Sequence, residues 1–401
     1  MLTVGDLQGE YSPVAPSRVI FGQGKTETLR DEITALGGRR VFVLSGRTVA
    51  EKTDAVRRAS NALGHTCVGI YSGLTQRAPL TAAVEATKMA LEAEADTLVG
   101  VGGSTISDAA RMIAVMMAEN IITEDRLREL GHQQGGLLEP TLEGKRLPLQ
   151  VSVPTTLSAG EFNIGGGNVL DDASNHKIRV RHPSLFAHLI VLDPDMTVGT
   201  PDWLWLSTGV KAMDHCIEHL YSRGNQPATD ATALMAAERL FHFLPRSRQS
   251  DGDPAARLEC LIAAWMSMIG SPNVSSGLSH GLGHIIGVKY SVGHGYTSCV
   301  TQPYVMEYNR TVSAHKQALL ARSAGIDIKG MDDETAAECA AQAVGDFIIG
   351  LGMPHRLREL EIPREDLPVI AEMALEDGAT KNNAIPMTSV DQMMQVLEAA
   401  F

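Results

Sequence analysis

The stretch STGVKAMDHCIEHLYS, residues 207–222, predicts a helix that carries the candidate site residues of the second half of the chain. Its polar residues recur at helical spacing, because side chains three or four positions apart lie on one side of a helix that turns about 100° per residue. We expect this helix to begin after Gly209. The polar residues on that side are Lys211, His215 and, less squarely, Asp214 and Glu218.

A second stretch, SHGLGHIIGVKYSVGHG, residues 279–295, carries the matching histidines. His280 and His284 are one turn apart on a predicted helix, and His294 follows after a turn. Together with His215, these residues predict that four imidazoles converge.

The two stretches resemble the metal-binding half of the iron-containing (group III) alcohol dehydrogenase family. That family's pattern is G-x-D-A-L-x-H-A-I-E, followed by H-G-x-x-H and then H-G. His215, His280, His284 and His294 each stand on a motif position, but Lys211 stands where the family has a metal-ligating Asp. The maleylacetate reductase branch of the superfamily also lacks that Asp, so the resemblance is closest to that metal-independent branch.

The exchange of Asp for Lys decides our expectation about metal. An ammonium group beside a divalent ion repels it by several kcal/mol, on the order of the Coulomb energy at an effective dielectric constant of ~20. We therefore expect no metal, with Lys211 polarising a carbonyl oxygen or holding a substrate carboxylate instead. If a metal is bound, its ligands would be His215, His280 and His294, and Asp214 is a rival ligand.

Composition narrows the class of protein. The chain has 401 residues, 44% of them hydrophobic, and a formal net charge of -13, which argues against nucleic acid or anionic membrane as a partner. Its five cysteines are scattered without C-x-x-C pairs, which is typical of a reducing compartment. Residues 1–17 contain no signal-peptide pattern. We expect a soluble cytoplasmic homodimer that acts on a small molecule.

The first half of the chain alternates apolar runs with amphipathic segments, which predicts βαβ units and a mainly parallel, Rossmann-like sheet. From Pro201 onward helical patterns dominate. We therefore expect an α/β dinucleotide-binding domain over 1–197 and an all-helical domain over 198–401, with the catalytic site in the cleft between them. The predicted strands are 18–21, 41–45, 67–71, 97–101, 149–154 and 189–193. The main predicted helices are 49–63, 80–95, 107–117, 229–243, 254–268, 333–349 and 390–400.

The nucleotide-binding motif is GVGGSTISD, residues 100–108, between a predicted strand and a predicted helix. Glycines let the backbone approach a pyrophosphate, and the helix N-terminus favours its charge. The resemblance extends to this motif and to a second one, Pro154-Thr155-Thr156, whose hydroxyls would bond ribose or phosphate. The expected cofactor-binding residues are Gly46, Arg47, Gly102, Gly103, Ser104, Thr105, Asp108, Thr155, Thr156 and Ser158.

The choice between NAD and NADP depends on the residues that follow the first central strand. An acidic residue there would bind the ribose 2′-OH and repel a 2′-phosphate. This chain has Ser45, Gly46 and Arg47 instead, so NADP should be accepted as well as NAD.

These residues favour a metal-free NAD(P)H-dependent oxidoreductase that reduces a carbonyl group, of an anionic oxo acid or of an aldehyde. The basic run from His176 to His182 would suit an anionic substrate, although charge runs are usually solvated. Lys211 and a histidine would stabilise the oxyanion, with His284 or His280 as proton donor. The alternatives are a metal-dependent group III alcohol dehydrogenase, a dehydroquinate synthase-like lyase, and a binding protein without turnover.

Overall fold

The computed structural model describes residues 18–174, 176–249 and 252–401. Met1–Ser17, on which the expectation about a signal peptide rested, lie outside the described residues. The described chain forms two compact units. One contains residues 18–205 and Ser247–Ile262, and the other contains Leu206–Arg246 and Ala263–Phe401. The sequence predicted a domain boundary at 197/198, whereas this division falls inside α7 (Asp202–Tyr221). Most of α9 (Pro254–Ile269) also belongs to the first unit.

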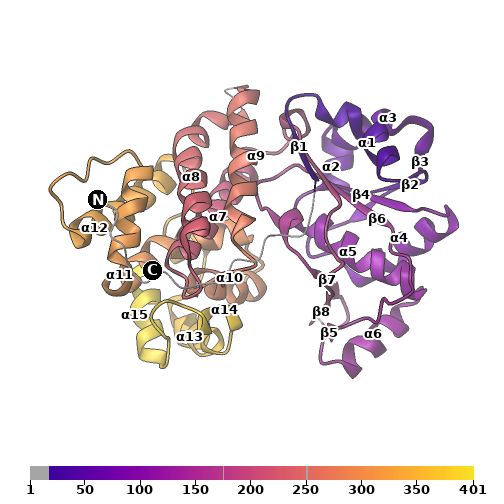
Figure 1. Ribbon diagram of the computed structural model, residues 1–401. Coiled ribbons are helices and arrows are strands. Elements are labelled where there is room, and N and C mark those ends of the chain that lie inside the picture. The colour runs from indigo at the N-terminus through magenta and orange to yellow at the C-terminus, as the bar shows by residue number, and fades with distance from the viewer. Residues whose placement is uncertain (1–17, 175, 250–251) are drawn as a thin grey trace. The chain divides into compact units, whose positions relative to one another are not determined.

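The first unit is built on a six-stranded sheet in which every pair of neighbouring strands is parallel (Figure 1). The strand order is β1-β9-β6-β4-β2-β3. The strands are β1 (Arg18–Phe21), β2 (Val41–Gly46), β3 (Cys67–Leu74), β4 (Thr97–Gly102), β6 (Leu149–Pro154) and β9 (Leu189–Leu192). The predicted parallel α/β class is confirmed, and the run at 18–21 is an added edge strand, as expected.

The sheet is buried on both faces. Val41 and Val43 of β2 belong to one apolar core with α1 and α3, whereas Phe42 and Leu44 belong to a second core with α4 and α5. Continuous apolar runs such as 41–44 are what a strand covered on both sides requires. The helices of this unit are α1 (Leu29–Ala35), α2 (Arg47–Lys52), α3 (Ala55–Leu63), α4 (Leu80–Glu92), α5 (Ser104–Glu119) and α6 (Glu124–Gln133).

One predicted helix, 49–63, is wrong, because the chain forms two helices there. The break falls at Thr53, which has extended backbone. Its Oγ1 donates to the Val49 carbonyl at 2.6 Å and accepts from the Ala55 N–H at 3.2 Å. The hydroxyl thus competes with the helical hydrogen bonds, as threonine does at helix ends.

The basic run that the sequence assigned to substrate binding lies mostly in a strand. β8 (His176–Arg181) pairs antiparallel with β7 (Gly166–Asp171) and parallel with β5 (Leu137–Leu138), forming a separate three-stranded sheet. Ile178 and Val180 point into the core while the charged residues between them are exposed. This period-2 alternation is typical of a half-buried strand, so the fold alone accounts for the outward-facing charges.

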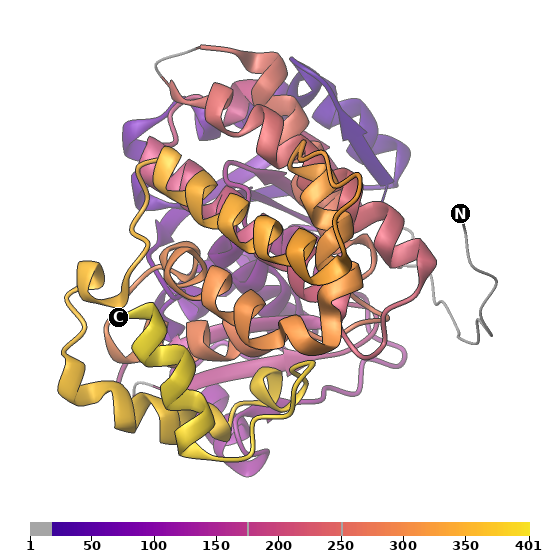
Figure 2. The ribbon, with the colours of Figure 1, turned by 90° about the vertical axis from the view of Figure 1, so that its left-hand side faces the viewer.

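The second unit is helical, as predicted. Its long helices α11 and α12 lie side by side (Figure 2). Among the described residues, no helix combines the length and the apolar character needed to cross a membrane. The helices that begin in this unit are α8 (Pro227–Phe243), α10 (Leu278–Lys289), α11 (His294–Ser323), α12 (Asp333–Gly350), α13 (Leu367–Leu375), α14 (Gly378–Lys381) and α15 (Val390–Ala400).

The expectation that the organising helix begins after Gly209 is wrong, because α7 begins at Asp202 and Gly209 lies inside it. A Cβ at Gly209 would lie 2.5 Å from the side chain of Leu244. The glycine therefore permits close packing against Leu244 and does not mark a helix start.

A close approach of two helices also explains Gly281 in α10. A Cβ there would lie 2.0 Å from Thr380 Oγ1 and 2.9 Å from the Thr380 backbone nitrogen. Thr380 is fully buried in α14. The glycine therefore allows α14 to lie against α10, the helix that carries two of the candidate histidines.

We predict that Gly281→Ala destabilises the protein by roughly 1–3 kcal/mol, the usual cost of overpacking a core. Gly345→Ala in α12 is the control, because no atom lies within 4 Å of the added Cβ. It should stabilise the helix by about 0.5–1 kcal/mol. Urea unfolding followed by circular dichroism measures both changes, and equal midpoints for the two variants would contradict the packing argument.

Candidate active site

Helix α7 presents two rows of polar side chains to the interior of the helical unit. Lys211, His215 and His219 follow one another at four-residue spacing, and Asp214 and Glu218 form the parallel row. Apart from the half-buried Lys211, these side chains are almost completely buried. Carboxylates and imidazoles are seldom buried so fully unless they bond to one another or to a ligand.

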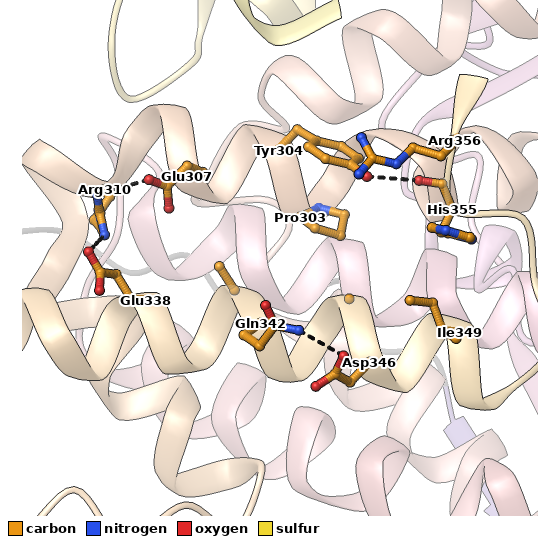
Figure 3. A pocket seen from close by; sticks show the side chains of 12 residues that line it. Pro303, Tyr304, Glu307, Arg310, Glu338, Gln342, Asp346, Ile349, His355 and Arg356 are labelled. Carbon is orange, nitrogen blue, oxygen red and sulfur yellow. Dashed lines mark hydrogen bonds and ion pairs between the residues drawn. The ribbon is translucent and has the colours of Figure 1, made fainter. Parts of the chain in front are cut away.

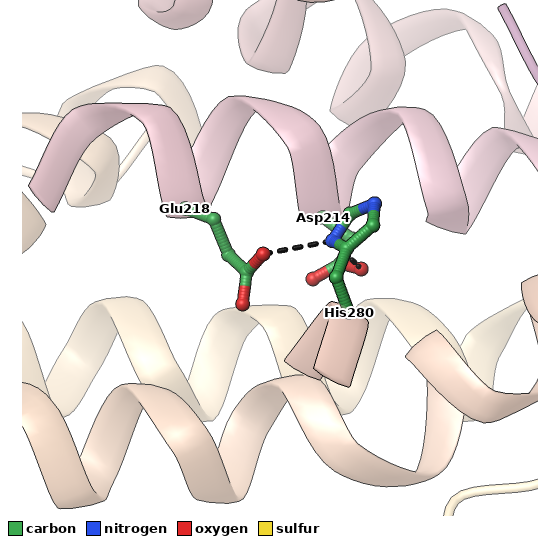
Figure 4. A group of neighbouring side chains, drawn as sticks. All are labelled: Asp214, Glu218 and His280. Atoms are coloured by element: carbon green, nitrogen blue, oxygen red, sulfur yellow. Dashed lines mark hydrogen bonds and ion pairs between the residues drawn. The ribbon is translucent and has the colours of Figure 1, made fainter. Parts of the chain in front are cut away.

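His280 of α10 lies against both carboxylates of α7 (Figure 4). Its Nδ1 is 2.7 Å from Glu218 Oε2 and 3.2 Å from Asp214 Oδ2. Glu218 accepts at Nδ1 and the Asp214 carboxyl lies beside it, so the imidazole carries a proton there and its Nε2 is the atom left for other partners.

Glu218 is also bonded to the start of α10. It accepts from the backbone N–H of Gly277 at 2.7 Å and from that of Ser279 at 2.8 Å. Asp214 in turn accepts from Ser298 Oγ of α11 at 2.8 Å. The carboxylates therefore join three helices as well as orienting one imidazole.

The carboxyl groups of Glu218 and Asp214 differ in pKa. Burial raises the pKa of Glu218, but the positive charge of His280 and three hydrogen bonds outweigh burial and lower it overall. Burial and the charge of Glu218 together raise the pKa of Asp214 to about 6, despite the opposing effects of His280 and of hydroxyl hydrogen bonds. Glu218 is thus the ionised partner, and Asp214 takes up a proton first.

The histidines form a continuous row. Ring centroids are 6.2 Å apart for His219 and His215, 5.0 Å for His215 and His280, 5.2 Å for His280 and His294, and 5.6 Å for His294 and His284. His294 approaches α10 at Gly283, where a Cβ would lie 2.7 Å from its ring. The structure thus brings His215, His280, His284 and His294 together.

Lys211 belongs to the same cluster. Burial lowers the pKa of His215 well below its ordinary value, and the positive charges of His280 and Lys211 lower it further. Burial and the positive charge of Lys211 both lower the pKa of His280. The negative charges of Asp214 and Glu218 outweigh them, so the pKa of His280 is raised overall. Lys211 lies one helical turn before His215 on α7, so its ammonium is on the same side of that helix as the imidazole.

His219, at the buried end of the row, gives a pH prediction. Burial and the charge of His280 lower its pKa from 6.5 to about 4, although Glu218 acts in the opposite direction. In the unfolded chain His219 takes up a proton at a higher pH than it does in the folded protein. The contribution of His219 to the stability of the fold is therefore full above pH 6.5 and falls as the pH falls from 6.5 to about 4. The loss reaches at most about 1.4 kcal/mol per pH unit.

We predict that His219→Gln reduces this pH dependence because the amide does not titrate. The free energy of unfolding, measured by urea titration across that pH range, should then fall less steeply than in the wild type. The same change at the exposed His65 is the control. Parallel profiles for wild type and His219→Gln would show that His219 is not the titrating group.

The two expected nucleotide-binding loops lie next to each other. They follow β4 and β6, which pair with Gly102 opposite Pro154. The Ser104 N–H donates to Ser158 Oγ at 3.2 Å, and Ser158 Oγ lies 3.0 Å from Thr156 Oγ1. Thr155 is bonded through its N–H to Gly102, and Thr105 lies in the first turn of α5.

Asp108 is largely engaged by the fold. Its carboxylate accepts from Arg111 at 3.2 Å and from Asn168 Nδ2 at 2.8 Å. Arg111 is almost completely buried and also donates to the carbonyls of Gly160 and Glu161. The pair therefore fixes the second loop against α5.

Gly46 and Arg47 lie where the sequence placed them, at the end of the first central strand. Gly46 ends β2 and caps α2, and Arg47 is exposed as the first residue of that helix. This position leaves the guanidinium accessible to an anion.

A separate hollow of about 490 Å³ lies between α11 and α12 (Figure 3). Arg310 at its rim pairs with Glu307 and Glu338, and Gln342 donates to Asp346. These pairs satisfy several of its charged groups internally.

Comparison with known proteins identifies the family. Residues 16–194 match the model of the iron-containing alcohol dehydrogenases, and residues 205–401 match the C-terminal model of the same family. The chain belongs to the iron-containing alcohol dehydrogenase family. It is therefore an oxidoreductase of the dehydrogenase and reductase type, and the predicted superfamily is confirmed.

Two relatives and one solved structure are similar to this chain over almost its whole length. The chain is 30% identical over 392 residues to dehydrogenase ALT3 of Alternaria alternata, covering 91% of this chain and 99% of that protein. It is 27% identical over 388 residues to a maleylacetate reductase of a Rhizobium species, covering 95% of each. The fold matches that of sulfoacetaldehyde reductase from Bifidobacterium kashiwanohense in complex with NAD⁺, with a TM-score of 0.82, 18% identity and coverage of 98% and 99%.

The family name implies a metal ion, but the residues at the family's ligand positions do not fit one. Lys211 supplies a positive charge where a carboxylate is needed. Within the described part of the chain, one group of three potential ligand side chains has all its ligand atoms within 4.8 Å, and it consists of Asp214, Glu218 and His280. His215 and His294 are not in that group, and the His280 atom that faces the carboxylates is the Nδ1 already hydrogen-bonded to Glu218.

Sequence reasoning did not find Asp377, whose Oδ2 lies 3.0 Å from His284 Nδ1. The two residues are 93 positions apart. No spacing pattern connects them, because the contact depends on how α14 packs against α10.

Proposed function

We propose that the chain reduces a carbonyl group with NAD(P)H and without a metal ion, and that Lys211 supplies the positive charge. The observation that carries this proposal is that Lys211 is half-buried on α7 one helical turn before His215, at the position where the family has its metal-ligating Asp. A fixed ammonium can stabilise the negative charge that develops on a carbonyl oxygen.

The proposed reaction needs one hydride and one proton. A bound reduced nicotinamide would supply the hydride to the carbonyl carbon, and the carbonyl π electrons would move to oxygen. Lys211 stabilises the resulting alkoxide, and a histidine, His280 or His284, donates the proton that gives the alcohol. An anionic substrate, such as an oxo acid, would find a second favourable interaction with Lys211.

The cofactor is a nicotinamide dinucleotide. The glycine-rich turn before α5 and the hydroxyls of Thr155, Thr156 and Ser158 suit a pyrophosphate and a ribose. The NAD⁺ complex of the sulfoacetaldehyde reductase with this fold supports the same cofactor here. Arg47 extends the proposal to NADP, because a guanidinium can pair with a 2′-phosphate.

A second candidate is a metal-dependent dehydrogenase with a displaced ion. Asp214 and Glu218 bring two carboxylates beside His280, and Asp214 Oδ1 has no hydrogen-bond partner. An ion there would have to displace the proton on His280 Nδ1, which is hydrogen-bonded to Glu218 and lies 3.2 Å from Asp214 Oδ2. The metal-free mechanism requires no such change.

Metal content separates the two candidates. We predict that the purified protein contains well under one equivalent of iron or zinc and that a chelator does not inhibit it. Lys211→Asp should gain a divalent ion, measured by mass spectrometry of the metal, and lose carbonyl reduction. Lys329→Asp makes the same charge change on the surface and is the control. A stoichiometric, chelatable ion needed for wild-type activity would contradict the metal-free proposal.

Cofactor titration tests the role of Arg47. Wild-type protein should bind NADPH at least as tightly as NADH, measured by fluorescence. Arg47→Gln should weaken NADPH binding about tenfold, because a charge-assisted hydrogen bond contributes about 1.5–3 kcal/mol, with little change for NADH. Lys88→Gln, an exposed residue of α4, is the control. Tenfold tighter binding of NADH by the wild type would refute the proposal.

A further inference from the structure

Asp377 holds the imidazole of His284 from behind. It lies between α13 and α14, and its Oδ2 is 3.0 Å from His284 Nδ1. Its Oδ1 accepts from the Ala379 N–H at 2.8 Å as the N-cap of α14. The side chain of Asp377 is 17% exposed, whereas that of His284 is 52% exposed.

The segment that carries Asp377 is fixed to α10 at two further points. Thr380 packs against Gly281, where there is no room for a Cβ. At the end of the segment, Asn383 Oδ1 accepts from the Leu278 N–H at 3.3 Å and from Asn309 Nδ2 at 2.9 Å. Asp377 is therefore part of a braced structure, unlike most surface ion pairs, whose partners are held only by each other.

The carboxyl group of Asp377 is held in its ionised form. Burial raises the pKa of Asp377, but the hydrogen bond and charge of His284 and the N–H groups of Ala379 and Thr380 outweigh burial and lower it. An ionised carboxylate at Nδ1 keeps the proton on Nδ1 and leaves Nε2 as the reactive atom.

This arrangement repeats the one at His280, one helical turn earlier, where Glu218 and Asp214 occupy the Nδ1 side. The two histidines differ in exposure, because His280 is buried and His284 is open to water. His284 also stands next to His294 in the row of rings. It is therefore the most exposed histidine of the cluster, since His294 is half-buried, and it can exchange protons with solvent.

We propose that Asp377 is a positioning residue for the reaction: it fixes the tautomer and orientation of His284, so that Nε2 delivers the solvent proton to the nascent alkoxide. The inference rests on the proposed carbonyl reduction and assigns the proton donor within it. Asp377 itself touches neither substrate nor cofactor, and no proton leaves it.

The test compares Asp377→Asn, His284→Ala and the double variant by steady-state kinetics with NADPH and a responsive oxo acid or aldehyde. Asparagine keeps the acceptor that caps α14, but it offers an N–H to Nδ1 and so favours the wrong tautomer. We expect Asp377→Asn to lower kcat about 10- to 100-fold. This is less than the ~10²- to 10⁴-fold contribution of the proton donor itself, which His284→Ala removes. KM should change less than about threefold in each variant. The double variant should have the same kcat as His284→Ala, because Asp377 acts only through His284.

A matched control is available in the same unit. His355 and Glu359 form another partly exposed pair, with Nδ1 3.3 Å from Oε2. Glu359→Gln should leave kcat and KM unchanged. A near-normal kcat in Asp377→Asn, or independent multiplicative losses in the double variant, would overturn the assignment.

A second readout does not depend on turnover. Nitrogen NMR at alkaline pH, where imidazoles are neutral, reports which ring nitrogen of His284 carries the proton. The His284 signals are assigned as those that are missing from the spectrum of His284→Ala. We expect the Nδ1–H form in the wild type and the Nε2–H form in Asp377→Asn. The same tautomer in both proteins would overturn the inference. Absence of turnover in the wild type with this tautomer switch intact would instead refute the proposed function.

Discussion

The hydrogen bonds accepted by Glu218 are the constraint on which the rest of the site depends. One buried carboxylate accepts from two backbone N–H groups at the start of α10 and from His280 Nδ1. It therefore fixes the position of α10 relative to α7, the orientation of one imidazole and, through the helical spacing, the position of His284. Removing one member of such a buried set leaves the others without partners, which is far more costly than the loss of an exposed pair.

The charges in the cluster are arranged in layers. The carboxylates of Asp214 and Glu218 lie on the Nδ1 side of His280, and its Nδ1 proton is directed at Glu218. Lys211 acts on His215 and His280 as a positive neighbour. The negative charge of the cluster therefore lies on the Nδ1 side of His280, and Lys211 carries a positive charge on the same helix as the two carboxyl groups.

Local patterns in the sequence predicted much of the fold. The strands at 149–154 and 18–21 and the helix at 390–400 were predicted within their observed bounds, because apolar runs and helical periodicity are local signals. The same signals predicted the shared helical turn of His280 and His284. They did not separate α2 from α3, because a threonine hydroxyl ended the first helix, and they missed β8, whose alternation was hidden by its charges. Asp377 could not be predicted, because its contact with His284 depends on the packing of α14.

The length of α11 has an electrostatic consequence for the cluster. This helix has 30 residues, begins at His294 and has no side-chain cap at its N-terminus. Aligned peptide dipoles place the equivalent of about half a positive elementary charge at such an end. The field of the backbone therefore adds to that of Lys211 on the His294 side of the row. It makes this end of the cluster attractive to a negatively charged oxygen.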